Sequence, residues 1–471
     1  MGIIHILHGI GMAQVVAFTA RCLSCFMQGG SLKSYGVLVD SLTRQANMSF
    51  TLTGLILPLQ QSLAYLLAPL ASVIYQRFGA RVAVSCGGLL VAFGYIGNGV
   101  LPLHPILLFI FCCCAGIGFG IASTPTYMFL KEAFPDKTVF GIVQGIADQA
   151  QYVGVSILPV VFDKLQYAYG MQGALLLFAG INLNILVAAA LLKPIRRSTI
   201  RESLAMKDST VHDSEKEGGR SAMMNDSIER YVRNDTNKTE TSSQSREKAG
   251  NSSPASSEEI QSSNHDDQSD SYYAVLNRNR SLIFLMLVAL STSFSYFGWV
   301  LFLIPLGKEK GLTSEDAVLL STFTGMGAFI GRVWSIILFV RRTKSPFQFF
   351  GMPCLLQSIM FFLLAKSPSD FYTLAGISFV TGICFGCTGS SVGGVCSLKV
   401  RESDFNKGIV LTFLPIALGT EVGGGVTGAV HDVTGSSEIV FLVLTGSSLY
   451  IVLMSIIWSV YEWYETPQKV V

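Results

Sequence analysis

Charged residues are scarce in this sequence. Only 14% of its 471 residues are Asp, Glu, Lys or Arg, against about 25% in a typical soluble domain. Half of the residues are hydrophobic, and the mean hydropathy is +0.49. A chain of this composition is not expected to fold as a soluble protein. The formal net charge of only +2 and the lack of long basic tracts give no reason to expect a nucleic-acid partner.

Histidine is equally scarce, with six residues. An enzyme site needs nucleophiles, acids and bases grouped in one place, and no segment groups histidine with Asp, Cys or Ser in that way. The ten cysteines include two CxxC pairs, Cys22/Cys25 and Cys384/Cys387, a spacing that can bind a metal or support redox chemistry. All ten lie in apolar segments, which favours cysteine as a small buried residue. We therefore expect no enzyme activity, no metal site and no cofactor.

Long apolar runs are abundant instead. A helix of about 20 residues crosses the roughly 30 Å hydrocarbon core of a bilayer, whereas a membrane barrel would show shorter segments of alternating polarity. The sequence predicts an all-α membrane protein with twelve transmembrane helices. Their ranges are 12–38, 51–75, 82–101, 105–130, 139–162, 171–192, 281–305, 317–340, 347–365, 371–397, 408–430 and 439–458.

A long polar segment separates the first six predicted helices from the last six. Residues 193–280 are rich in Ser, Asp, Asn, Glu and Lys, and such a segment cannot bury enough apolar surface to offset the entropy lost on ordering. The sequence therefore predicts an N-terminal six-helix half at 1–192, a disordered linker at 193–280, and a C-terminal six-helix half with a short tail at 281–471. Many secondary transporters consist of two such halves around a site at the middle of the membrane.

Lysine and arginine are unevenly distributed between the predicted loops. Loops on the side of the N-terminus, such as those with Arg77, Arg81 and Lys131, carry about twice as many of these residues as loops on the opposite side. Cytoplasmic loops of membrane proteins show this excess. We therefore expect both termini and the linker in the cytoplasm.

Five charged residues lie inside predicted membrane helices: Lys33, Arg332, Arg21, Asp148 and Glu421. A charge at this depth costs at least about 2.5 kcal/mol and is retained where it faces a partner or a water-filled cavity. Lys33 and Arg332 together predict a chamber that attracts an anion, while a nearby acid exchanges protons. Each residue also has a structural interpretation: the two cations extend to the headgroups, Asp148 pairs with Arg21, and Glu421 is protonated and packed.

Several short motifs occur in a fixed order along nearly the whole chain except the linker. They are Gly29 to Leu38; Pro69-Leu70 with Arg77 to Arg81; Gly145 to Ala150 with Val153-Gly154, Pro159, Tyr169-Gly170 and Gly173-Ala174; Gly298-Trp299 with Pro305; Gly325 to Arg332; and Asp432 to Gly435. This ordered set resembles the monocarboxylate transporter family of the major facilitator superfamily. The resemblance implies the major facilitator fold, with Lys33 and Arg332 at the positions that take the substrate carboxylate.

The chain departs from the family pattern beside that arginine. Proton-linked members carry an aspartate four residues before it, and here the position is Ala328. In this fold the fifth and eighth helices meet between the two halves, and Asp148 and Arg332 lie at similar depth in them. We therefore predict an Asp148–Arg332 pair in place of the missing one. Arg21 is the alternative partner, in which case Asp148 would lock two helices together.

From the residues and the resemblance we expect a secondary transporter of small organic monocarboxylates, similar to lactate or pyruvate, that works by alternating access and proton symport. Phe385 is expected to shape the pocket between Lys33 and Arg332, and Asp148, Glu421 and Arg21 are candidates for proton coupling or ion pairing. The alternatives are a facilitative carrier of a zwitterionic or aromatic amphiphilic substrate and a non-transporting membrane sensor. The resemblance also implies the plasma membrane and, for some members, a single-span accessory glycoprotein as partner.

Overall fold

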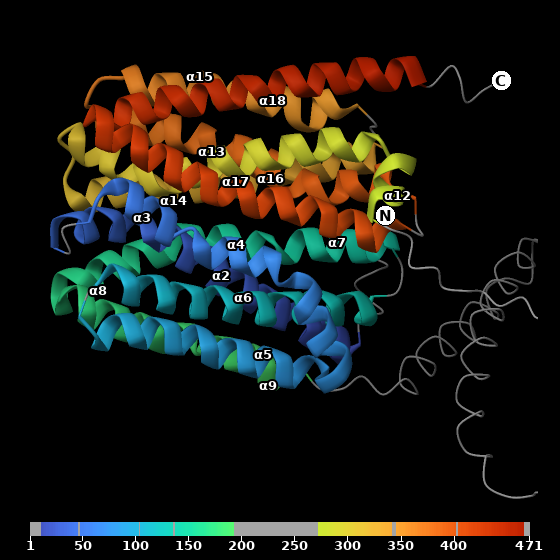
Figure 1. Cartoon of the computed structure of the whole chain (residues 1–471), viewed down its shortest axis with the longest axis horizontal. Helices are drawn as coiled ribbons and strands as arrows, with labels where there is room; N and C mark the ends of the chain where they lie inside the picture. Colours follow the sequence, from blue (N-terminus) through green and yellow to red (C-terminus); the bar gives the residue numbers. More distant parts are fainter. Residues whose placement is uncertain are drawn as a thin grey trace, which may run out of the picture. The chain divides into compact units, whose positions relative to one another are not determined.

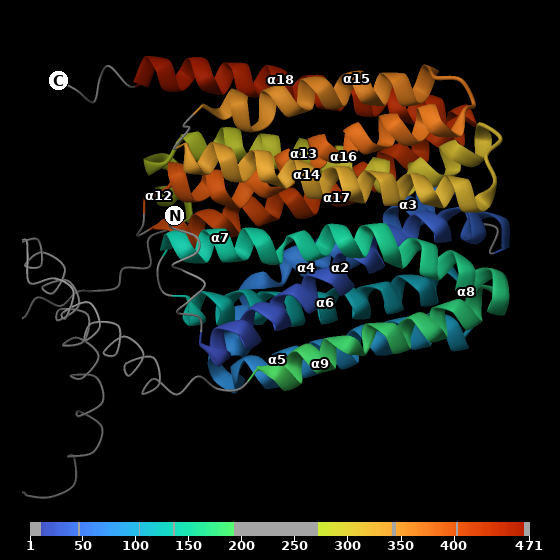
Figure 2. The same ribbon diagram turned by 180° about the vertical axis from the view of Figure 1, so that it is seen from behind.

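The structure, a computed structural model, describes residues 11–45, 48–102, 104–134, 137–192, 272–341, 345–401 and 404–465. Within these ranges nearly all residues are helical and no strand is present, in agreement with an all-α membrane protein. The helices run side by side in a bundle (Figures 1 and 2). We call the end of this bundle that carries Met12 and Glu465 the terminal end, and the end that carries Phe50 and Asp432 the distal end.

The helices form an N-terminal and a C-terminal group that pack into one unit. The N-terminal group consists of α2 (Met12–Gln45), α3 (Phe50–Ile56), α4 (Leu59–Leu66), α5 (Ala68–Val100), α6 (Pro105–Ala133), α7 (Lys137–Ala147), α8 (Gln149–Asn182) and α9 (Asn184–Leu191). The C-terminal group consists of α12 (Tyr272–Arg278), α13 (Ser281–Glu309), α14 (Ser314–Val340), η1 (Phe347–Gly351), α15 (Met352–Lys366), α16 (Phe371–Lys399), α17 (Phe405–Thr434) and α18 (Ser437–Glu465).

Each of the twelve predicted spans falls on one or more of these helices. Among the described residues, nine helical stretches are long and apolar enough to cross a membrane, and one of them, 139–191, contains two predicted spans. Gly79 and Gly170 interrupt α5 and α8 with φ of 81° and 70°, which glycine adopts without steric cost. Both lie where the sequence predicts a loop between two spans. The arrangement is thus compatible with twelve crossings.

The predicted linker lies mostly outside the described residues, except for its last part. That part differs from the prediction, because helix α12 spans Tyr272–Arg278. Arg278 donates to one oxygen of Asp404 at 2.9 Å, and the side-chain amide of Asn279 donates to the other at 3.0 Å. The C-terminal group therefore begins before residue 281. Polar side chains hold this segment, which explains why apolar composition did not reveal it.

Small residues allow the two groups to approach closely. A Cβ atom added to Gly54 in α3 would lie 2.2 Å from the carbonyl oxygen of Gly424 in α17. A Cβ atom added to Gly325 in α14 would lie 2.0 Å from Oγ of Ser156 in α8. Small residues at such contacts let helix backbones approach each other in membrane bundles. These crossings bring α8 beside α14, and α3 and α4 beside α17.

Polar contacts join the two groups at the distal end. Asp432, at the end of α17, accepts hydrogen bonds from the backbone N–H groups of Phe50 at 2.9 Å and Thr51 at 2.8 Å. The Thr51 hydroxyl donates to the same carboxylate at 2.5 Å. The ring of Phe50 also packs on His431, with 3.9 Å between the centroids. The carboxylate therefore satisfies the first N–H groups of a helix that belongs to the other group.

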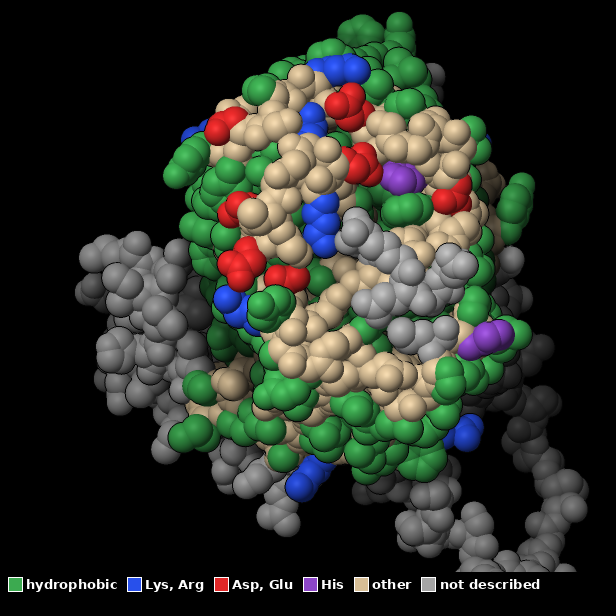
Figure 3. Space-filling view, turned by 90° about the vertical axis from the view of Figure 1, so that its left-hand side faces the viewer, with side chains coloured by type: hydrophobic (Ala, Val, Ile, Leu, Met, Phe, Trp, Pro, Cys, Tyr) green, Lys and Arg blue, Asp and Glu red, His purple; other side chains and the backbone are tan. Residues whose placement is uncertain are grey.

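The surface divides into charged ends and apolar flanks. Figure 3 looks onto the distal end and shows Lys, Arg, Asp, Glu and His side chains on that face, with hydrophobic side chains around it. Large apolar side chains such as Leu89, Ile106 and Leu453 are more than half exposed. Exposed apolar surface on this scale marks a region that contacts something other than water. It fits flanks that face the hydrocarbon of a bilayer.

Candidate functional site

Asp148 lies between α7 and α8, at the junction of the two groups of helices. One carboxylate oxygen, Oδ1, accepts a hydrogen bond from Arg21 of α2 at 3.1 Å. The other oxygen, Oδ2, accepts one from Arg332 of α14 at 2.8 Å. The two partners proposed from the sequence as alternatives therefore bind the same carboxylate at once. The contact with Arg332 joins the groups, whereas the contact with Arg21 stays within the N-terminal group.

Arg21 is held by the N-terminal group on several sides. One of its terminal nitrogens donates to the carbonyl and the hydroxyl of Ser123 at 3.2 Å each, and to the Thr126 hydroxyl at 3.4 Å. Its guanidinium also lies 5.7 Å from the ring centroid of Tyr127. Arg21 is buried, with 9% of its surface exposed. Its position is therefore set by α6 as well as by Asp148.

The carboxylate of Asp148 has two further neighbours. Gln144, one turn earlier, donates to Oδ1 at 2.6 Å, and the Cys25 thiol lies 3.6 Å from the same atom. The cluster of Arg21, Asp148 and Arg332 thus holds two guanidinium groups and one carboxylate. It carries one more positive than negative charge.

Arg332 receives its carboxylate from another helix because its own helix offers none nearby. Ala328, one turn earlier, is buried with 2% of its surface exposed. In the same stretch α14 packs tightly on α16, since a Cβ atom at Gly331 would lie 2.0 Å from the carbonyl oxygen of Ile383. Tyr152 of α8 also lies beside Arg332. The side of α14 that carries Arg332 therefore faces the N-terminal group.

Lys33 of α2 is completely buried, with no exposed surface. Its ammonium group lies 3.5 Å from the ring centroid of Trp299 in α13 and donates to the backbone carbonyl of Val300 at 3.1 Å. A cation placed over an indole ring is attracted by the negative face of the ring. One interpretation of the sequence was that Lys33 extends to the headgroups. Its complete burial contradicts that interpretation. Lys33 lies between the two groups, on an aromatic partner.

An aromatic cluster on the C-terminal side adjoins this lysine. The ring centroid of Phe385 lies 5.0 Å from that of Trp299 and 5.2 Å from that of Tyr296. The indole nitrogen of Trp299 and the hydroxyl of Tyr296 are buried, and neither has a hydrogen-bond partner among the described residues. Buried polar atoms of this kind usually have a partner. Phe385, predicted as a pocket residue, is thus part of an aromatic cluster that contains two donors without a partner among the described residues.

Glu421 of α17 is separate from the arginine cluster. Its side chain lies near Ser62 of α4, and its Oε1 atom is buried without a hydrogen-bond partner among the described residues. Ser62 itself donates to the carbonyl of Ala417 at 3.1 Å. Glu421 therefore faces the other group of helices, as Asp148 does, but at a different crossing and with no ion-pair partner among the described residues.

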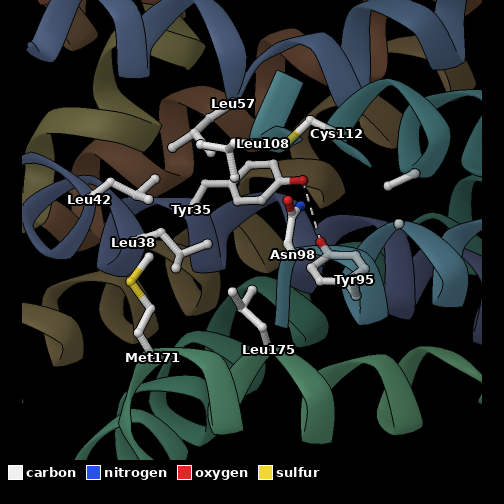
Figure 4. A pocket seen from close by; sticks show the side chains of 12 residues that line it. Tyr35, Leu38, Leu42, Leu57, Tyr95, Asn98, Leu108, Cys112, Met171 and Leu175 are labelled. Atoms are coloured by element: carbon white, nitrogen blue, oxygen red, sulfur yellow. Dashed lines mark hydrogen bonds between the residues drawn. The ribbon is translucent and has the colours of Figure 1, made fainter. Parts of the chain in front are cut away.

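A small cavity lies inside the N-terminal group, away from these charges (Figure 4). The hydroxyls of Tyr35 and Tyr95 both reach the side-chain oxygen of Gln60, and Asn98 and Cys112 complete the polar part of the wall. The remaining wall is aliphatic, and the space suffices for about one water molecule. Neither Lys33 nor Arg332 lines it. This cavity is too small to hold an organic substrate.

Sequence reasoning missed several residues that complete these contacts. Trp299 was identified as part of a motif, but its contact with Lys33 joins residues more than 260 positions apart and has no signal in sequence spacing. Tyr296 and Tyr152 were not singled out, because a tyrosine in an apolar helix is ordinary. Gln144 was detectable in principle, since it precedes Asp148 by one helical turn.

Comparison with known proteins identifies the family. The model of the major facilitator superfamily matches residues 21–420. Among curated proteins, monocarboxylate transporter 7 of Homo sapiens is 23% identical over 389 residues, which cover 80% of this chain and 71% of that protein. Monocarboxylate transporter 9 of Mus musculus is 27% identical over 37% of this chain and 34% of its own length. Monocarboxylate transporter 12-B of Danio rerio is 32% identical over 28% of this chain and 27% of its length.

The matches differ in extent. The chain spans about seven tenths of the length of monocarboxylate transporter 7, but only about a third or less of the lengths of monocarboxylate transporters 9 and 12-B. The relatives bear the name that the sequence motifs predicted, so the resemblance is confirmed at low identity. They are transporters and not enzymes.

Solved structures agree on the fold. A POT family transporter in complex with 5-aminolevulinic acid superposes with a TM-score of 0.66 at 16% identity, over 96% of this chain and 97% of that chain. A bacterial homologue of the human lysosomal transporter Spinster, inward-facing and unoccupied, gives 0.63 at 12% identity, with 96% of both chains covered. With the apolar flanks, the paired groups of helices and the family match, the chain is a multi-pass membrane protein that belongs to the major facilitator superfamily.

Proposed function

We propose that this protein is a secondary transporter of small organic monocarboxylates and that it works by alternating access. One observation carries the proposal: two guanidinium groups share a single carboxylate where the two groups of helices meet. A buried cluster with one unmatched positive charge is stabilised by one further anion, because an uncompensated charge in a low-dielectric interior is costly. A substrate carboxylate supplies that charge.

The wider charge inventory supports a substrate with a single negative charge. Away from the two ends of the bundle, the described charged side chains are Arg21, Lys33, Arg332, Asp148 and Glu421. Three cations and two carboxylates leave one net positive charge. With both carboxylates ionised, a monoanion neutralises this charge, whereas a dianion would exceed it.

The two groups of helices are the proposed moving parts. Asp432, Phe50 and His431 hold the two groups together at the distal end in this conformation, and we propose that substrate reaches the site from the terminal end. Because Lys and Arg are in excess near the terminal end, we propose that this end is cytoplasmic. From the family resemblance, we propose that the protein lies in the plasma membrane. Substrate drives the change of conformation only if it stabilises the two open states differently.

Proton symport is part of the proposal, with Asp148 in the role of the aspartate that Ala328 replaces. The titratable groups near Asp148 are Arg21, Cys22 and Cys25 of α2, Tyr65 of α4, Tyr127 of α6, Tyr152 of α8 and Arg332 of α14. A proton on Asp148 would release Arg332 for the substrate. Uptake of labelled lactate at two external pH values tests this role, which is wrong if Asp148→Asn leaves the pH dependence unchanged.

A facilitative carrier of an amphiphilic, aromatic substrate is the second candidate. Its support is the aromatic cluster of Tyr296, Trp299 and Phe385, in which two donors without a partner in the described part of the chain could offer hydrogen bonds beside apolar faces. Such a substrate would depend on Phe385 more than on Arg332. Competition of aromatic and aliphatic acids against labelled lactate distinguishes the two candidates.

Uptake of labelled lactate or pyruvate tests the main proposal. Wild type is compared with Lys33→Ala and Arg332→Ala at equal surface expression, with and without a co-expressed single-span glycoprotein. We expect uptake in the wild type and a loss of at least about tenfold in both variants, since each removes a deep cation. A wild type that reaches the surface and carries no acid of a broad panel would favour a membrane sensor instead.

A further inference from the structure

The contact between Lys33 and Trp299 marks the crossing of α2, in the N-terminal group, with α13, in the C-terminal group. Besides lying on the indole ring, the ammonium group donates to the backbone carbonyls of Trp299 at 3.5 Å and Val300 at 3.1 Å. Among the described residues, all partners of Lys33 belong to the C-terminal group. If the two groups separate at this crossing, the ammonium group therefore loses every contact that replaces its hydration.

The indole of Trp299 is held in place by its own group. Its ring centroid lies 5.6 Å from that of Tyr296 and 5.0 Å from that of Phe385, and only 1% of Trp299 is exposed. The lysine reaches this ring because α2 approaches α13 closely: a Cβ atom at Gly36 would lie 2.7 Å from the carbonyl oxygen of Val300. The C-terminal group thus supplies a fixed aromatic face, and α2 carries the ammonium group to it.

We propose that Trp299 is a positioning residue for distal closure: its indole replaces the water around the Lys33 ammonium group, and it thereby sets how readily the distal end closes. The inference rests on the proposed alternating access, but on no particular substrate. Lys33 lies in the distal half of α2, so opening of the distal end hydrates it. In the closed conformation described here it has no exposed surface, and the indole face takes over from water.

The two residues have opposite effects on closure. The free energy of dehydrating an ammonium group exceeds that of a cation–π contact, so Lys33 opposes closure and Trp299 reduces this opposition. Trp299→Leu therefore favours the open distal end. Lys33→Met favours the closed distal end, although it breaks the same contact. A latch that held the distal end closed by net attraction would open with either substitution.

The rate at which a membrane-impermeant maleimide labels Thr53→Cys measures opening of the distal end, because Thr53 is fully buried in this conformation. Labelling of the protein without this cysteine is subtracted as background. We expect labelling about tenfold faster in Trp299→Leu, a smaller increase in Trp299→Phe, which keeps an aromatic face, and several-fold slower labelling in Lys33→Met. In a double-mutant cycle, Trp299→Leu should have no effect when Lys33→Met is also present, because no ammonium group remains.

Trp458 of α18 provides the matched control for the loss of an indole. It is as buried as Trp299 and packs on Phe350 within the C-terminal group, and no cation lies over its ring in the described part of the chain. Trp458→Leu removes the same volume from the core of the same group. We expect it to leave the labelling rate of Thr53→Cys unchanged.

Three results would overturn the inference and leave the proposed function intact: labelling of Trp299→Leu at the wild-type rate, faster labelling in Lys33→Met, or an undiminished effect of Trp299→Leu when Lys33→Met is present. The last is the pattern of lost packing alone. If Trp299→Leu does not reach the membrane, the same cycle with Trp299→Phe decides.

The proposed function fails in ways that the labelling distinguishes. A folded Thr53→Cys protein that is never labelled would show that the distal end does not open. That result contradicts alternating access, and the inference falls with it. A protein that shows the expected labelling pattern but takes up no monocarboxylate would contradict the proposed substrate class and support the inference.

Discussion

Lys33 is an unusual residue because it is completely buried and has no carboxylate partner among the described residues. Its ammonium group is compensated by a tryptophan face and backbone carbonyls. A cation–π contact is worth about 2 kcal/mol when desolvated, less than the several kcal/mol that it costs to dehydrate an ion. The position therefore sacrifices stability, which indicates that the charge is retained for function.

This imbalance predicts that Lys33→Met separates stability from transport. An apolar side chain of similar length removes the dehydration cost, so we expect the unfolding midpoint in detergent to rise by a few degrees, while lactate uptake falls at least about tenfold. A thermal unfolding scan of the purified protein measures the expected change in stability, and the uptake assay measures the expected loss of transport.

Lys310 provides the matched control for this substitution. Its ammonium group is also buried, but it donates to the carbonyls of Ala365 and Ser367 and lies 3.8 Å from Glu438. Lys310→Met should therefore lower the unfolding midpoint. Equal destabilisation by both methionine variants would show that Lys33 is as well compensated as Lys310, contrary to our argument.

At the level of helices, α3 and α17 cross so closely that glycine is required on both. A Cβ atom at Gly424 would lie 2.1 Å from the carbonyl oxygen of Gly54. Gly424→Ala must push the helices apart, and overpacking of this kind costs about 1–3 kcal/mol. We expect reduced thermal stability and a lower transport rate. Gly446→Ala in α18, where the added methyl group meets no atom within 4 Å, should change neither; a similar loss in both would refute the steric explanation.

The contact between α12 and the start of α17 is expected to depend on pH. Hydrogen bonds from Asn279 and then Arg278 keep the pKa of the Asp404 carboxyl below its usual value. A depressed pKa means that the contact contributes stability above the unfolded-state pKa of about 3.9 and loses it as pH falls through the folded-state value.

Hydrogen exchange of residues 272–280 measures this effect. Protection should be constant from neutral pH down to about pH 5 and should fall below about pH 4, after correction for the intrinsic exchange rate. Asp404→Asn should show weak protection throughout, without the acid transition. Protection that is the same in this variant and in wild type would mean that Asp404 does not hold α12.

For the whole molecule, the all-helical fold and the order of the helices follow from the apolar runs, and the breaks at Gly79 and Gly170 fall where loops between spans were predicted. The residues around Asp148 show the limit of this reasoning. Depth along the helices predicts that Asp148 can meet Arg332 or Arg21, but a linear pattern treats these as alternatives. Only the positions of both carboxylate oxygens show that one side chain serves both. The Lys33–Trp299 contact was beyond prediction, because it depends on how the two groups pack.

The contacts of Asp432 that hold the two groups together at the distal end give a further prediction. Asp432→Asn replaces one acceptor oxygen by a donor in front of the N–H groups of Phe50 and Thr51, at a cost of about 1 kcal/mol. The distal end should then open more often, by about fivefold. Thr53 is fully buried, so a Thr53→Cys variant should be labelled by a membrane-impermeant maleimide only when the distal end opens. We expect the labelling rate of this cysteine to increase when Asp432→Asn is added. Equal labelling rates with and without Asp432→Asn would show that this carboxylate does not control the closure.

The capping of α3 by a residue of the opposite group has a consequence for solvent. When the distal end separates, the first N–H groups of α3 lose their acceptor, and an uncapped helix start must then be hydrated. Each opening of the distal end therefore takes up water at this point, and turnover through that end should be sensitive to osmotic stress. Solutes that are excluded from the protein surface favour its dehydrated form, so they should slow substrate release at the distal side more than at the terminal side.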